Sequence, residues 1–220
     1  DLIVGASGND KGGDGAGGAY VIFGTAGGFG TVESDGRSVI DLAMLTPAEG
    51  FFIQGPEDLS SAGSSVASAG DLNGDGFDDL IIGAYRSDVG GTDAGRTYII
   101  FGKASPVNIE LTALTLADGF IIQGDDAGDN LGRQVASAGD INKDGFDDLI
   151  IGALGGDNGG TDAGEAYVIF GKASGFTNID LTALTPAQGF IIQGDAAGDL
   201  TGFRVASAGD VNADGFDDIV

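Results

Sequence analysis

The sequence predicts an all-β fold made of β-propeller blades, each with four antiparallel strands. Two observations carry this prediction. The chain repeats itself with a period of about 70 residues. Each period contains four short runs rich in Val, Ile, Phe and Tyr, and these runs are flanked by Gly and Asp. Such runs are typical of strands, and four strands per repeat is the composition of a propeller blade.

The four runs follow in a fixed order, shown by one complete set. The first is Val66-Ala-Ser-Ala-Gly70, and Leu80-Ile-Ile-Gly-Ala84 follows it after an acidic loop. The third is Thr97-Tyr-Ile-Ile-Phe-Gly102, and the fourth is Gly119-Phe-Ile-Ile-Gln-Gly124. Branched and aromatic residues favour strands and glycines favour the turns between them, so each run is predicted as one strand.

The periodicity divides the chain into repeat units of approximately 1–65, 66–134 and 135–204, with a partial unit at 205–220. No linker separates them, so residues 1–220 are predicted as one propeller segment. Pairing of the run at Val205 with the N-terminal blade would be the usual way to close a propeller. Three blades, however, are fewer than the four to eight of closed propellers, so we expect a fragment of a longer array.

The connection after the third run has its own pattern. It contains Asn108-Ile-Glu-Leu-Thr-Ala-Leu114 or Asn178-Ile-Asp-Leu-Thr-Ala-Leu184. Thr46-Pro-Ala-Glu49 and Thr185-Pro-Ala-Gln188 resemble helix starts, with a capping hydroxyl, an early proline and a Glu or Gln at the third position. We therefore predict one helical turn there, packed over the outermost strand. The first connection is longer, and its excess around residues 27–35 is predicted to be a surface excursion.

A nine-residue acidic loop joins the first two runs. Its copies are Asp71-Leu-Asn-Gly-Asp-Gly-Phe-Asp-Asp79, Asp140-Ile-Asn-Lys-Asp-Gly-Phe-Asp-Asp148 and Asp210-Val-Asn-Ala-Asp-Gly-Phe-Asp-Asp218. Side-chain oxygens at positions 1, 3, 5 and 9 and the carbonyl at position 7 can converge on one hard cation. Each loop is therefore predicted to bind Ca²⁺. The predicted ligands are Asp71, Asn73, Asp75, Phe77, Asp79, Asp140, Asn142, Asp144, Phe146, Asp148, Asp210, Asn212, Asp214, Phe216 and Asp218.

These loops are not EF-hands, because position 12 holds Ile82 or Ile151 where an EF-hand needs a bidentate Glu. Without metal, two carboxylates at roughly 5 Å and an effective dielectric constant of about 20 repel each other by on the order of 3 kcal/mol before screening. Calcium would reverse that sign and stabilise each blade. The alternative is a solvated Asx turn that merely tolerates acidic residues.

The other acidic residues are assigned ordinary roles. Position 8 of the loop, which is Asp78, Asp147 or Asp217, is predicted to point into solvent. Aspartates in glycine-rich segments are predicted to hydrogen-bond their own turns. These turn aspartates are Asp88, Asp93, Asp125, Asp126, Asp129, Asp157, Asp162, Asp195 and Asp199.

The order Leu131-Gly132, Val135-Ala-Ser-Ala-Gly-Asp140, acidic loop, Leu149-Ile-Ile-Gly-Ala-Leu154 resembles the FG-GAP repeat of integrin α-subunit propellers and their bacterial relatives. Single residues depart from the family's two motifs, as in Leu131-Gly132 and Gly152-Ala-Leu154. The resemblance covers essentially the whole chain. It implies a seven-bladed propeller with calcium on one face, the loop ligands named above, and a role in adhesion or extracellular recognition. The high glycine content and the Thr-Ala-Leu-Thr-Pro spacers resemble large secreted bacterial proteins.

Composition excludes several classes of function. The formal charge of −25 would repel nucleic acid. The absence of Cys excludes disulfides and thiolate metal sites, and the absence of His removes the commonest general base. No run of about 18 apolar residues is present, so no membrane span is predicted.

The predicted function is a calcium-stabilised extracellular or cell-surface adhesion or structural module. Its partners would be other proteins or further copies of the same array, because repeat arrays bury each blade against a neighbour. A lectin-like propeller that binds surface glycans is one alternative, but Trp is absent and three of the four tyrosines lie in predicted strands. An accessory propeller of a secreted hydrolase is another. The acidic clusters recur by repeat and form no unique catalytic set, so an enzyme is not expected.

Overall fold

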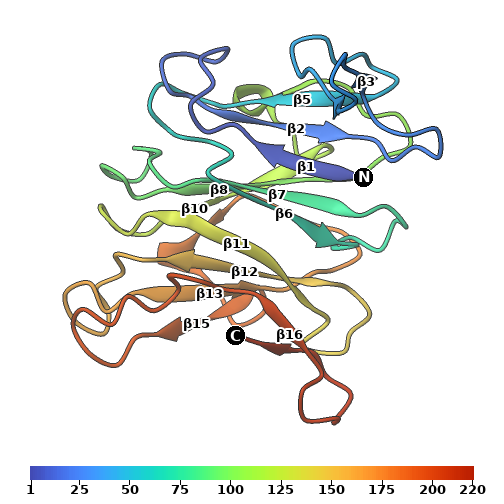
Figure 1. Ribbon diagram of the computed structural model, residues 1–220. Helices are drawn as coiled ribbons and strands as arrows, with labels where there is room; N and C mark the ends of the chain where they lie inside the picture. Colours follow the sequence, from blue (N-terminus) through green and yellow to red (C-terminus); the bar gives the residue numbers. More distant parts are fainter.

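The computed structural model describes residues 1–220 and is built almost entirely of β-strands. The strands form mainly antiparallel sheets that follow one another along the molecule like the blades of a fan (Figure 1). The predicted fold class of antiparallel blades is therefore confirmed. No helical segment is long and apolar enough to cross a membrane.

Three blades and the start of a fourth can be distinguished by strand pairing. The first contains β1 (Leu2–Gly5), β2 (Gly18–Ile22) and β5 (Gly50–Gln54). The second contains β6 (Ser65–Gly70), β7 (Asp79–Ala84), β8 (Arg96–Ile100) and β10 (Gly119–Gln123). The third contains β11 (Leu131–Gly139), β12 (Asp148–Ala153), β13 (Glu165–Ile169) and β15 (Gly189–Gln193). The two strands β16 (Ser207–Gly209) and β17 (Asp218–Ile219) pair with each other.

The core lies between neighbouring blades, so the middle strands are buried on both faces. Ile81 and Ile82 in β7 are both fully buried although they point to opposite sides of the sheet. Ile81 packs in a cluster with Leu149 of the third blade. Ile82 packs in a cluster with Ile53 of the first blade. Burial on both faces explains why these strands are continuous apolar runs and not alternating ones.

Glycines allow the blades to approach closely. A Cβ on Gly83 of β7 would overlap the carbonyl oxygen of Gly132 in β11, and a Cβ on Gly152 of β12 would overlap the carbonyl oxygen of Gly202. Gly5 of β1 and Gly63 meet in the same way. The repeated glycines are thus required by backbone contact between one blade and the next.

The edges of the outer strands in the first and second blades are covered by a segment from the following blade. The strand β9 (Ile109–Glu110) pairs in parallel with β5, and β14 (Ile179–Asp180) pairs in parallel with β10. The Asn108 side chain accepts a hydrogen bond from the Phe52 N–H at 2.9 Å, which satisfies one more group of that edge. Each connection therefore ties two blades together.

The helical turn predicted at Thr46 forms as a single turn, because the Gly50 N–H donates to the Thr46 carbonyl at 3.1 Å, and the Gly189 N–H makes the same bond to Thr185 at 3.2 Å. The second and third connections also contain short 3₁₀ segments that the sequence did not predict, η1 (Leu111–Ala113) and η2 (Leu181–Ala183), where a leucine packs into the core. At Thr46 the capping pattern does form, since its hydroxyl and N–H both donate to the Glu49 carboxylate, but the chain makes only a hydrogen-bonded turn before β5 begins. Gly50 enters the strand at once, which leaves no length for a helix.

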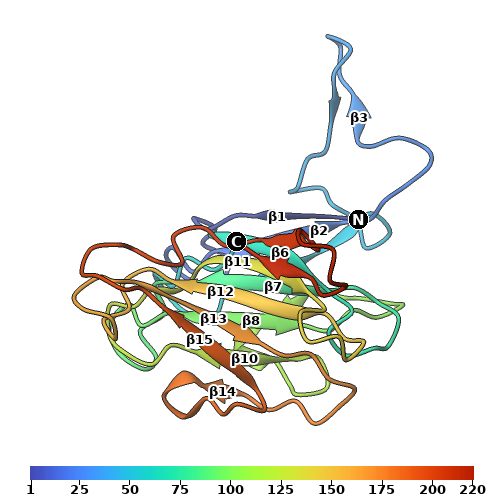
Figure 2. The same ribbon diagram turned by 90° about the horizontal axis from the view of Figure 1, so that it is seen from below.

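The long first connection forms the predicted surface excursion. It contains a small hairpin of β3 (Thr31–Val32) and β4 (Ser38–Val39), which are exposed. Figure 2 shows this hairpin standing away from the stacked sheets.

The contact between blades predicts the effect of a minimal substitution. Gly83→Ala should destabilise the protein by about 1–3 kcal/mol, because the new methyl group has to displace the backbone of the next blade. Gly8→Ala is the matched control, since a Cβ there meets nothing within 4 Å. Chemical denaturation of both variants checks this. Equal stability of the two would contradict the proposed role of the glycine contacts.

Candidate metal centres

The three acidic loops connect the first two strands of successive blades and lie along one side of the molecule (Figure 1). An irregularity in strand pairing precedes each loop, for example between Ser68 and Gly70. The positive φ of 67° at Gly70 turns the chain out of the strand. The repeat therefore presents its acidic loops in a row.

Within each loop the side-chain oxygens fold back onto the backbone. The Asp71 carboxylate accepts hydrogen bonds from the Asp75 N–H at 3.0 Å and from the Gly76 N–H at 3.0 Å. The Asn73 amide oxygen accepts from the same Asp75 N–H at 2.9 Å, and Asp75 accepts from the Phe77 N–H at 2.9 Å. The other two loops repeat this pattern. Positions 1, 3 and 5 thus turn toward the inside of the loop.

The position-9 aspartate ties the loop to the blade. Asp79 is fully buried, and its two oxygens accept from the Leu72 N–H at 3.1 Å and the Gly102 N–H at 2.8 Å. Burial raises the pKa of Asp79 to about 7, the two N–H donors oppose that rise, and the charges of Asp75 and Asp71 add to it. Burial likewise raises the pKa of Asp148 to about 6. The negatively charged form of the position-9 aspartate is therefore disfavoured.

Position 8 does not point freely into solvent, which corrects the sequence prediction. The Asp147 carboxylate accepts a hydrogen bond from the Asp71 N–H of the preceding loop at 2.8 Å. Asp217 accepts in the same way from the Asp140 N–H at 3.0 Å. Only Asp78 is exposed and accepts no hydrogen bond. In the second and third loops, the position-8 aspartate thus forms a hydrogen bond to the preceding loop.

Neighbouring loops also pack through the position-7 phenylalanine. The Phe146 ring lies against Gly74, where a Cβ would come within 2.5 Å of the ring. The Phe216 ring lies under Lys143, whose ammonium group is 5.1 Å from the ring centroid. Such cation–π contacts stabilise exposed sites modestly. The row of loops is therefore continuous, with each loop resting on the one before it.

The glycine-rich turns behave partly as predicted. The carboxylates of Asp88 and Asp157 accept from the N–H groups of Asp93 and Asp162 in their own turns, at 2.9 and 2.7 Å, so these roles are confirmed. Asp199 likewise accepts from the Ala196 N–H at 3.2 Å.

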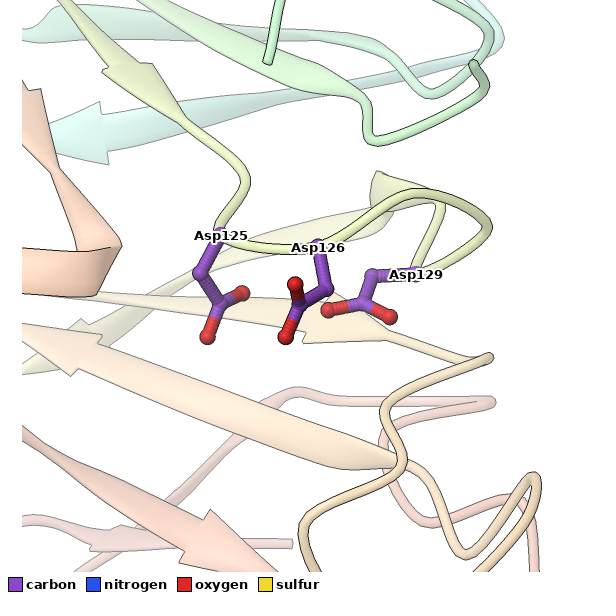
Figure 3. Close-up of side chains that lie close together, drawn as sticks. All are labelled: Asp125, Asp126 and Asp129. Atoms are coloured by element: carbon purple, nitrogen blue, oxygen red, sulfur yellow. The ribbon is translucent and has the colours of Figure 1, made fainter. Parts of the chain in front are cut away.

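A second acidic group departs from the turn prediction. In the segment between β10 and β11, the carboxylates of Asp125, Asp126 and Asp129 gather, and one oxygen from each lies within 4.8 Å of the others (Figure 3). None of them accepts a hydrogen bond from a backbone N–H; Asp125 instead accepts from the Tyr167 hydroxyl at 2.8 Å. Burial first, and then the charge of Asp125, raise the pKa of Asp129 to about 7. The turn interpretation is wrong for these three residues.

Two stretches of the chain, residues 62–100 and 131–169, match the FG-GAP repeat family. They cover the first three strands of the second and third blades, including the contact between Gly83 and Gly132 and two acidic loops. The chain carries FG-GAP repeats. In these FG-GAP repeats, the two glycine-containing motifs are the ones that bring neighbouring backbones together, as at Gly83 and Gly132.

The relatives include several integrin α subunits. Integrin alpha-IIb of Mus musculus is 28% identical over 175 residues, which are 76% of this chain and 15% of that protein. Integrin alpha ina-1 of Caenorhabditis elegans is 29% identical over 182 residues, which are 77% of this chain and 15% of that protein. Phosphatidylinositol-glycan-specific phospholipase D of Mus musculus is 35% identical over 115 residues, half of this chain and 13% of that protein. The chain thus spans a small part of the relatives it matches.

The loops of the FG-GAP repeats suit a hard cation. The side-chain atoms of positions 1, 3 and 5 that turn into the loops are oxygens. No Lys or Arg forms an ion pair with any loop residue, because the two ion pairs of the structure are Arg37–Asp35 and Lys103–Asp118. Oxygen-only, negatively charged loops are the chemistry that Ca²⁺ prefers.

The hydrogen bond between loops predicts that the same substitution at Asp147 and at Asp78 changes the free energy of unfolding by different amounts. Asp147→Ala should lower the free energy of unfolding by about 1–2 kcal/mol, because the Asp71 N–H loses a charged acceptor. Asp78→Ala removes the same side chain without such a bond and should stay within about 0.5 kcal/mol of the parent. Urea unfolding of the two variants measures the difference. A larger effect at Asp78 than at Asp147 would count against the bond.

Proposed function

We propose that the chain is part of a calcium-stabilised propeller that serves adhesion or recognition between proteins outside the cell or at its surface. The FG-GAP repeats and the integrin α relatives support the class of function. The observation that carries the proposal is the row of acidic loops joined from blade to blade. In this proposal residues 1–65, 66–134, 135–204 and 205–220 are successive repeat units of one domain.

The loop residues named from the sequence are proposed as the ligands. Asp71, Asn73 and Asp75 already turn inward, and Phe77 would add its carbonyl. Asp79 contributes charge from a position fixed by two backbone N–H groups. Bound calcium would supply the positive charge that the loop lacks. The same assignment holds at the equivalent positions of the other two loops.

In this proposal, a partner protein is recognised by segments that rigid blades hold in place. Because each loop rests on its neighbour, fixing the loops fixes the angle between blades, and rigid blades hold their connecting segments in a constant arrangement for a partner protein. Rigid scaffolds commonly carry binding residues on such connections. Three of the four tyrosines, Tyr20, Tyr98 and Tyr167, are buried, so they offer no stacking platform for a glycan. The partners proposed are therefore proteins, further copies of the array included.

Removal of calcium tests the stabilising role. At about a hundredfold excess over the dissociation constant, each filled site should add about 2.7 kcal/mol to the free energy of unfolding, which raises Tm by about 5 °C or more. Thermal unfolding in EDTA and in 10 mM CaCl₂ measures this shift. Magnesium at the same concentration is the control, because it fits flexible oxygen cages poorly.

A variant with Asp75, Asp144 and Asp214 all changed to Ala tests whether the Tm shift between EDTA and calcium comes from the loops. This variant should lose most of the calcium-dependent shift while keeping its β-sheet signal. Equal Tm values for the parent protein in EDTA and in calcium would reject calcium stabilisation.

Adhesion is tested separately from stability. Beads coated with the protein should adhere to each other or to a second protein surface in calcium, and at least tenfold less in EDTA. Beads coated with the triple variant are the matched control. Adhesion that is absent in calcium although the Tm shift is present would separate the two claims and reject the adhesive role for this segment.

A further inference from the structure

An arginine group, made of Arg86, Arg133 and Arg204, lies at the edge of the blades opposite to the acidic loops. The strands β7 and β11 belong to neighbouring blades and lie close together (Figure 1). The acidic loops lie at the start of β7 and at the end of β11, whereas Arg86 follows the end of β7 and Arg133 lies near the start of β11. All three arginines are exposed. On a chain with a formal charge of −25, they are a local reversal of the surface charge.

A single tyrosine ring holds two of these arginines. The guanidinium carbon of Arg133 lies 4.7 Å from the centroid of the Tyr85 ring, and that of Arg86 lies 5.6 Å from the same centroid. Arg204 adjoins them, because its guanidinium donates to the side chain of Gln134 at 2.6 Å. None of the three arginines belongs to an ion pair of the structure. Aromatic rings attract a guanidinium group without neutralising it, so its charge stays free for a carboxylate from outside.

The backbone presents both tyrosine-bound arginines on fixed segments. A β-bulge in β11 between Leu131 and Gln134 contains Arg133, and bulges re-aim the side chain that they carry. Arg86 lies in the turn Ala84–Ser87, whose last N–H donates to its first carbonyl at 3.1 Å. Side chains on such segments lose less freedom when a partner binds.

The fold does not require the tyrosine and its two arginines. The first repeat forms its strands with small residues at the equivalent positions, which are Ser7, Gly8 and Ser64. The third repeat has Leu154 and Gly155 where the second has Tyr85 and Arg86. A charged group that one repeat adds to a shared scaffold, on exposed connections, is typical of a binding site.

We propose that the arginine group binds an acidic segment of a partner protein, with one carboxylate at Arg86 and another at Arg133. This inference rests on the proposed function, in which the partners are proteins. Arginine forms strong, paired hydrogen bonds with carboxylates, and Arg and Tyr are enriched among the residues that dominate protein interfaces.

The spacing of the two arginines suits an extended segment. Because both guanidinium groups lie against one ring, they are at most about 10 Å apart. In an extended chain, side chains two residues apart point to the same side and are separated by roughly 7 Å. A segment with acidic residues at alternate positions can therefore reach both arginines and cover the Tyr85 ring.

The partner is a different protein and not a long polyanion. A polyanion would extend from this small group onto a surface of its own sign, which repels it. The alternate carboxylates of this chain, such as Asp71 and Asp75, are already turned into their own loops by backbone N–H groups.

Fluorescence anisotropy with two labelled peptides tests the proposal. One peptide has Glu and the other has Gln at alternate positions, with Ser between them. In 50 mM NaCl and 2 mM CaCl₂ the parent protein should bind the Glu peptide at least tenfold more tightly than the Gln peptide. The Arg86→Gln, Arg133→Gln variant should lose at least tenfold in affinity for the Glu peptide. The matched control is Arg37→Gln, Lys103→Gln, which removes the same charge elsewhere and should change the affinity less than twofold.

Tyr85 is tested as a positioning residue. Tyr85→Phe keeps the ring and should keep the affinity within twofold. Tyr85→Leu removes the ring and should weaken binding at least threefold without a change in Tm, because the third repeat carries Leu154 at this position.

Equal binding of the two peptides, or equal binding of the Glu peptide by the parent and the double arginine variant, overturns the proposal. Binding of heparin that requires the two arginines, without binding of the Glu peptide, also overturns it and assigns the group to sulfated polysaccharides. Adhesion of coated beads that persists although the Glu peptide does not bind rejects the arginine group alone. Peptide binding without adhesion supports the arginine group and rejects the adhesive role alone.

Discussion

Close contact between the backbones of successive blades is the constraint on which the structure depends. A sheet that is apolar on both faces is stable only when another sheet covers each face, and here the glycines at Gly83 and Gly132 let the covering sheet come near enough. The continuous runs such as Ile81-Ile82, the parallel edge strands β9 and β14, and the clusters shared between blades all follow from this stacking. Each blade is therefore completed by its neighbour.

Stacking also brings negative charge together in two places. At one edge the acidic loops rest on each other through Asp147 and Asp217, and at the other edge the carboxylates of Asp125 and Glu165 meet at the Tyr167 hydroxyl. A chain with a formal charge of −25 can hold such groups close only when the charge is neutralised locally. The calcium proposed for the acidic loops would then become part of the contact between blades.

The features that could be predicted from the sequence are those that depend on residues within a single repeat. The strand order and the position of the acidic loops follow from runs and turn residues that lie next to each other. The role of Asp147 could not be predicted, because its partner is 76 residues away and meets it only when blades stack. Asp125 and Tyr167 are 42 residues apart in the same way. One signal was available, since Glu165 stands where the preceding repeat has Arg96, and such a charge reversal inside a regular repeat marks a changed environment.

The bond from position 8 to the preceding loop has a direction. Each loop gives a carboxylate to the loop before it and offers an N–H to the loop after it, so the row has two unlike ends. A two-fold related pair of molecules would bring like ends together and leave both kinds of group unmatched. Lengthening of the row by another molecule therefore has to proceed head to tail, which is the arrangement that builds rings or filaments instead of symmetric dimers.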